Sequence, residues 1–336
     1  MRLLPFLLAL PLAGSLLATP LAHDGVRIAL KYEKDQVLRY RSTLTMEQTV
    51  SGPTEITTRN ETAQVFAQNV KEVDKEGVAT LACEWEAVRM KVEAGGGVTI
   101  DYDSTDPKST PPEGLAGFAK LVGLGFEMQV KQNGEIVRLK GMKEALDALF
   151  EGSDPGVAVM KQMFQGILDD DNMKRTFEAT VWPEHELKED EVWSRDVAMK
   201  LGPLGEATLK YEYTFRGIVD EGGERCAKLD IAVVMKFGDE IDTSNMPGAE
   251  QLDIELDVKD SKGSGELYFA IDKGRLVRTT MDQDVEFSMN MKAKEAIPGF
   301  PEEGLDIGFD MSTKVEMRLL GKDDPPFGEA RSDAKK

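Results

Sequence analysis

The chain has 336 residues, of which 41% are hydrophobic, and its 61 acidic residues outnumber the 41 basic ones, for a formal net charge of −20. Such an excess of negative charge makes nucleic acid and anionic membrane surfaces poor partners. The length is enough to bury one large core or two ordinary ones.

The first residues predict export. Arg2 is followed by an apolar run from Leu3 to Leu17 and then by small residues before Asp24. The run is shorter than the roughly 20 residues that cross a bilayer, so we predict a secretory signal peptide over residues 1–23 rather than a retained anchor. We expect an extracytoplasmic protein, periplasmic or secreted, with no transmembrane segment after signal cleavage; its oligomeric state stays open.

Alternation of apolar and polar side chains is the main signal beyond the signal peptide. It predicts strands with one buried and one wet face, as antiparallel sheets have. The longest examples run over 207–216, 281–291 and 307–319. The turn residues agree, because Asn133-Gly134 and Lys273-Gly274 each separate two strand patterns and predict hairpins.

The middle of the chain changes to a helical period. Apolar residues at i, i+3 and i+4 predict a helix from Met142 to Phe150 and a second over 160–168, after Asp154 as a cap. These helices need a sheet or one another to cover their apolar stripes. The predicted fold is therefore mainly β (α+β), with two related curved antiparallel sheets and amphipathic helices between and across them.

The β regions on either side of the helices resemble each other in order. Asp35-Gln36-Val37 and Asp190-Glu191-Val192 each open a strand, and the two hairpins correspond as well. We interpret this as an internal duplication. Cys83 and Cys226 fall in strands of different halves, so we predict that they do not pair. The predicted division is a signal peptide over 1–23, a first β half over 24–181 with helices over 141–181, a second β half over 182–320 and a disordered tail over 321–336.

Motifs for catalysis or metal binding are mostly missing. No nucleophile elbow, zinc pattern or phosphate-binding glycine loop occurs, and His185 lies in an acidic stretch typical of a surface loop. Two acidic clusters, 101–106 and 169–171, could hold calcium, but they lack the glycine and the final glutamate of a calcium loop. We predict a protein that is not an enzyme and has no cofactor or metal.

Methionine is the least ordinary feature, since several of its 16 copies fall on inward strand positions. Thioether chains fill irregular cores and also line adaptable apolar pockets, and both interpretations stay open. The candidate ligand-lining residues are Met281, Phe287, Met289, Met291, Phe309, Met311 and Met317.

The Asp-Glu-Val-Trp start at 190–193, the Tyr-Asp-Ser run at 102–104 and the twin hairpins resemble an exported bacterial family catalogued only as a domain of unknown function. The resemblance implies a β-rich extracytoplasmic protein and carries over no catalytic residue. Each half is also similar to the curved sheet with crossing helices of periplasmic lipoprotein carriers, which enclose an apolar cavity. Two functions follow as hypotheses: binding of an apolar or lipid-like ligand or, alternatively, a structural or protein-interaction component of the cell envelope without a small-molecule ligand.

Overall fold

A computed structural model describes residues 25–95, 97–111, 116–149, 174–175, 178–200, 206–237, 250–259, 261–295 and 300–328. The predicted signal peptide, the predicted helix over 160–168, the acidic cluster over 169–171 and residues 329–336 lie outside the described residues. Within the described residues, no helix is both long and apolar enough to span a membrane.

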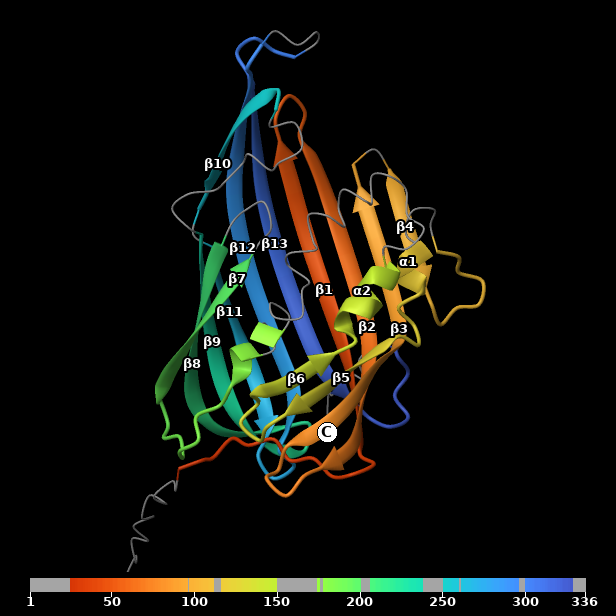
Figure 1. Cartoon of the computed structure of the whole chain (residues 1–336), viewed down its shortest axis with the longest axis vertical. Coiled ribbons are helices and arrows are strands. Elements are labelled where there is room, and N and C mark those ends of the chain that lie inside the picture. Colours follow the sequence, from red (N-terminus) through yellow and green to blue (C-terminus); the bar gives the residue numbers. More distant parts are fainter. Residues whose placement is uncertain are drawn as a thin grey trace, which may run out of the picture.

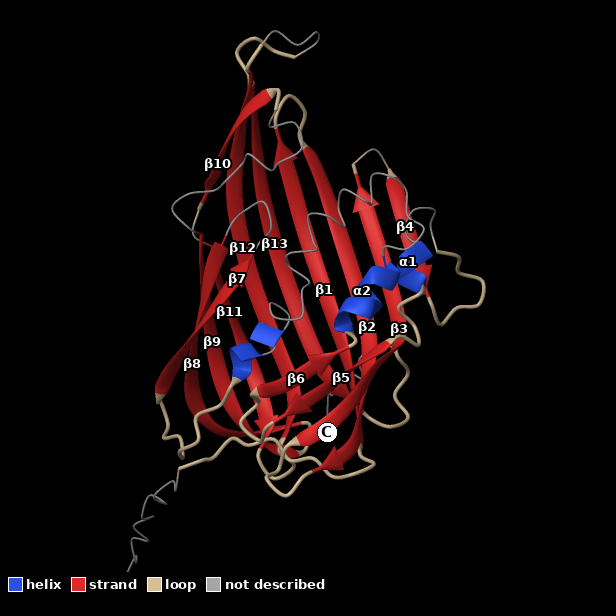
Figure 2. Ribbon diagram, viewed as in Figure 1, coloured by secondary structure: helices blue, strands red, loops and turns tan. Residues whose placement is uncertain are grey.

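The described chain is dominated by strands (Figure 2). The strands are β1 (Val37–Ser51), β2 (Ile56–Val73), β3 (Ala79–Ala94), β4 (Val98–Asp103), β5 (Gly125–Val130), β6 (Ile136–Lys140), β7 (Val192–Lys200), β8 (Glu206–Glu221), β9 (Glu224–Phe237), β10 (Leu252–Val258), β11 (Ser261–Ala270), β12 (Arg275–Ala293) and β13 (Leu305–Leu320). The helical elements are α1 (Ala116–Ala119), α2 (Met142–Leu149) and the 3₁₀ turn η1 (Glu178–Thr180). The mainly β prediction is confirmed, as are both hairpins and, within one residue, the helix that begins at Met142.

All thirteen strands belong to one antiparallel sheet, in the order β6-β5-β3-β2-β1-β13-β12-β11-β9-β8-β7, with β4 on β3 and β10 on β12. The prediction of two related curved antiparallel sheets is corrected to one sheet, because β13 pairs with β1 on one side and with β12 on the other. Without β13, each half would end in a long strand with unpaired N–H and C=O groups. β13 supplies hydrogen-bond partners to both of these edge strands.

The two halves repeat the same order of pairing, β1-β2-β3-β5-β6 and β7-β8-β9-β11-β12. Asp35 and Asp190 precede β1 and β7 with positive φ angles of 66° and 62°, a conformation that aspartate tolerates better than most residues. Their amides donate to matching strand carbonyls, at 2.9 Å to Val70 and 2.7 Å to Phe215. The repeated order is what a duplication requires, and the duplication itself stays a prediction.

The alternation along the strands sorts side chains onto two faces. The long strands run side by side along the long axis, and α2 and the β5–β6 hairpin lie in front of one face (Figure 1). This is the apolar face, because the main core forms where the sheet meets the segments in front of it. The opposite face carries mostly polar and charged side chains.

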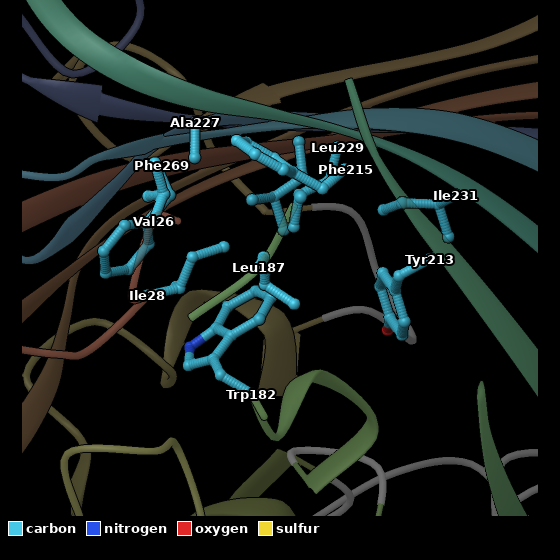
Figure 3. Packing of buried hydrophobic residues seen from close by; sticks show 11 residues of the cluster. Val26, Ile28, Trp182, Leu187, Tyr213, Phe215, Ala227, Leu229, Ile231 and Phe269 are labelled. Atoms are coloured by element: carbon cyan, nitrogen blue, oxygen red, sulfur yellow. The ribbon is translucent and has the colours of Figure 1, made fainter. Parts of the chain in front are cut away.

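The main core joins segments that are far apart in the sequence (Figure 3). Trp182 lies 5.8 Å from Phe269, ring centre to ring centre, and the hydroxyl of Tyr213 donates to the carbonyl of Ala179 at 2.8 Å. Trp182 and Leu187 are both buried here, close to the predicted division between residues 181 and 182. The cluster consists of Val26, Ile28, Trp182, Leu187, Tyr213, Phe215, Ala227, Leu229, Ile231, Leu267 and Phe269.

The first described residues link the hairpins of the two halves. The amide of Leu30 donates to the carbonyl of Gln132 at 2.7 Å, and the amide of Lys31 donates to the carbonyl of Gly274 at 2.9 Å. Gly274 has φ of 61°, and a Cβ there would lie 2.6 Å from the Lys31 nitrogen. This contact requires glycine for both its conformation and its lack of a side chain.

Residues 321–328 lie against the polar face, where the sequence predicted disorder. Arg39 Nη1 donates to the carbonyl of Asp324 at 3.1 Å, and Arg41 Nη1 donates to the carbonyl of Gly328 at 2.9 Å. Phe327 packs on a small buried cluster that contains Val65. Arginine side chains and one aromatic ring hold this part of the tail in place.

Candidate functional site

The seven candidate ligand-lining residues lie on the two central strands β12 and β13. In the pairing register Phe287 lies opposite Phe309, and Met289 lies opposite Ile307. The rings of Phe287 and Phe309 stack, with centres 4.4 Å apart and planes 10° from parallel. Met281, Met291, Met311 and Met317 stand on the same face by alternation. The structure therefore brings all seven onto one surface.

Two neighbouring strands extend this surface. Leu256 of β10 pairs with Met289, and Val50 of β1 pairs with Phe309. The β10 residues were not among the candidates from the sequence, although the alternation of apolar and polar residues over 252–258 indicates a strand. We call the combined surface the methionine face; it comprises Leu44, Met46, Val50, Leu252, Ile254, Leu256, Val258, Met281, Val285, Phe287, Met289, Met291, Leu305, Ile307, Phe309, Met311, Val315 and Met317.

The methionine face is only partly buried. Apart from Ile254 and Val285, which are 9% exposed, its members fall between buried and exposed. On the same side of the sheet, Leu229 is fully buried and Tyr213 is 1% exposed, because Trp182 and the N-terminal segment pack over them. The methionine face therefore offers large apolar side chains that are not packed to the density of the main core.

Polar but uncharged groups interrupt the methionine face. Gln48 lies opposite Met311, and Thr313 lies between Met46 on one neighbouring strand and Gln283 on the other. None of the residues that define the face carries a charge. Such a surface suits a ligand with a long apolar part, with a few hydrogen-bonding groups to orient it.

The other sequence candidates have structural roles. Asp103 Oδ1 accepts hydrogen bonds from the amide and hydroxyl of Thr105, and Asp106 Oδ1 accepts one from the amide of Lys108 at 2.9 Å. No group of three metal-ligating side chains occurs among the residues that the structure describes. His185 is exposed, and its Nε2 lies 2.6 Å from a carboxylate oxygen of Glu191. This contact lowers the pKa of Glu191.

Both cysteine thiols are free and buried. Cys83 is on β3 and Cys226 on β9, with five strands between them in the sheet, which is too far for a disulfide. Burial raises the pKa of the Cys83 thiol to about 12 and that of Cys226 to about 11.

We therefore expect neither thiol to react with Ellman's reagent at pH 8 in the folded protein, because thiolate is the reactive form. Both should react after unfolding in guanidinium without reductant. Rapid labelling of the native protein, or a Cys83–Cys226 cross-linked peptide, would contradict this prediction.

Fold and site together define a single-sheet antiparallel β protein with a partly buried apolar face. The chain belongs to a family of unknown function (DUF6263), whose sequence profile matches residues 76–259, more than half of the chain. The predicted membership of a domain-of-unknown-function family is thereby confirmed. No curated protein gave a significant match.

Three solved structures illustrate the remaining similarities. A lipovitellin structure, described as showing lipid–protein interactions, is 10% identical with a TM-score of 0.43, covering 89% of this chain and 27% of its own. OccK5 (OpdH) of Pseudomonas aeruginosa is 10% identical with a TM-score of 0.20, and the match covers 86% of this chain and 99% of OccK5. An outer membrane channel of Pseudomonas putida F1 is 7% identical with a TM-score of 0.21, and the match covers 89% of this chain and 98% of the channel. The chain thus spans about a quarter of the lipovitellin chain that it matches.

Proposed function

We propose that this protein is an extracytoplasmic, non-enzymatic binding protein that holds an apolar, lipid-like ligand on the methionine face. The observation that carries the proposal is the contrast between two parts of one surface. Leu229 and Phe269 are fully buried, whereas Phe287, Met289 and Phe309 are only partly covered. A contiguous, partly exposed apolar surface of this kind commonly marks a site that binds a ligand or another protein.

The side chains of the methionine face also suit such a ligand. Methionine has three rotatable bonds and a polarisable sulfur, so Met289, Met291 and Met311 can repack around acyl chains of different length. A rigid core of branched side chains would resist insertion of a guest. The predicted signal peptide supports a location outside the cytoplasm.

The test is a fluorescence titration of the mature protein with N-phenyl-1-naphthylamine, a neutral apolar probe, combined with native mass spectrometry of protein purified from its host. We expect saturable probe binding and a co-purifying species of lipid mass. A protein that binds no probe and carries no lipid would overturn the proposal. A co-purifying protein subunit in place of lipid would favour the alternative function, a protein-interaction component of the envelope.

A further inference from the structure

A cavity opens where β13 ends before its two neighbours. The last pairs of β13 are Leu320 with Arg39 on β1 and Arg318 with Arg278 on β12. Val37 and Leu38 therefore extend past the last β1–β13 pair, and residues 275–277 extend past the last β12–β13 pair. A cavity of about 700 Å³ lies there, bordered on its far side by the β8–β9 turn.

The cavity is lined by both apolar and charged residues. Its apolar lining is Val37, Leu38, Val277, Leu319 and Leu320, and its charged lining is Arg39, Arg275, Arg318, Lys322, Glu221 and Glu224. Arg39 is paired with Glu86 and Glu221 with Arg278, so five cations less three carboxylates leave a local charge of +2, on a chain whose net charge is −20. The charged lining of the cavity is thus net positive, although the protein as a whole is net negative.

A row of arginines continues this cationic region across the sheet. Arg41, Arg318 and Arg278 are direct neighbours on β1, β13 and β12. Like charges placed opposite one another destabilise a sheet. Arg278 is stabilised by Glu221 at 2.8 Å and by the ring of Tyr268, whose centre lies 4.5 Å from its guanidinium carbon. The row concentrates positive charge beside the cavity, which Arg318 also lines.

Arg275 lines the cavity and has one guanidinium donor without a partner among the described residues. Its Nη2 lies 2.5 Å from Glu224 Oε1, whereas its Nε and the second oxygen of Glu224 are buried without a hydrogen-bond partner among the described residues. A buried N–H group without a partner costs free energy, and a ligand oxygen would remove that cost.

We infer that this cavity binds an anion with a short apolar segment, such as a phosphate ester or a carboxylate. The forked guanidinium groups match the oxygens of the anion, and Val37, Val277 and Leu320, which lie on the same face as Arg318, contact the apolar segment. The site is distinct from the methionine face, because Arg318 follows Met317 in β13 and so points to the opposite side of the sheet. The inference does not depend on the proposed function.

Isothermal titration calorimetry of the full mature chain tests it, with octyl phosphate, octanoate, inorganic phosphate and 1-octanol as probes at low salt. We expect binding of octyl phosphate or octanoate, at least about tenfold weaker binding of inorganic phosphate and 1-octanol, and weakening by salt. Arg275→Gln should weaken binding about tenfold, since it removes a charge-assisted hydrogen bond, and Lys322→Gln should weaken it a few-fold.

Arg225→Gln is the matched control. Arg225 has the same charge on the same strand as Glu224, but it pairs with Asp272 and does not line the cavity. It should change affinity by less than about twofold. If Arg275→Gln fails to fold, Lys322→Gln decides the question. Equal affinities in the Lys322 and Arg225 variants, or inorganic phosphate binding as tightly as octyl phosphate, would overturn the inference. Met289→Glu should leave this binding unchanged, which separates this site from the methionine face.

Discussion

Replacing Phe269 with alanine is expected to lower the free energy of unfolding by about 3–5 kcal/mol, the usual range for a large buried aromatic side chain. Phe269 is fully buried and packs edge-on against Trp182 in the main core. The loss would leave a cavity between the sheet and the segment that crosses it. Urea unfolding followed by Trp fluorescence and circular dichroism measures the effect.

Phe287→Ala is the matched control for this substitution. Phe287 lies on the methionine face, where it is only partly buried, so its truncation should cost about 1–2 kcal/mol. Val192→Ala, at a position 52% exposed, should cost less than about 0.5 kcal/mol. Equal losses for Phe269 and Phe287 would mean that the methionine face is packed as a core, against the proposed function.

Met289→Glu is expected to weaken binding of the neutral apolar probe at least tenfold, because a carboxylate in contact with an apolar ligand loses its hydration. The partial exposure of Met289 allows the new carboxylate to reach water in the free protein, so the melting temperature should fall only modestly. Fluorescence titration gives the probe affinity, and thermal unfolding of the same samples gives the melting temperature.

Ser288→Glu provides the control for Met289→Glu. Ser288 is the adjacent residue of β12, exposed on the opposite face, so the same added charge should leave probe affinity unchanged. If Met289→Glu unfolds the protein outright while Ser288→Glu does not, the methionine face is solid core. In that case the structural alternative replaces the binding function.

Much of the candidate site was predictable from the sequence, because a strand fixes the face of each side chain locally. The alternation over 281–291 and 307–319 placed Phe287 and Phe309 on the same kind of surface. Partial burial was not predictable. It depends on which segments pack over the sheet, and Trp182 and Val26 pack over the residues of the main core.

The sequence by itself determined the strand-rich class, the two hairpins, the helix that begins at Met142 and the matching strand starts after Asp35 and Asp190. Each of these depends on neighbours within a few residues. Only the tertiary structure decided that the two halves share one sheet, since the partner of a strand is chosen by long-range pairing. The same pairing aligned Arg41, Arg318 and Arg278. These arginines are far apart in the chain, and only the register of three strands makes them neighbours.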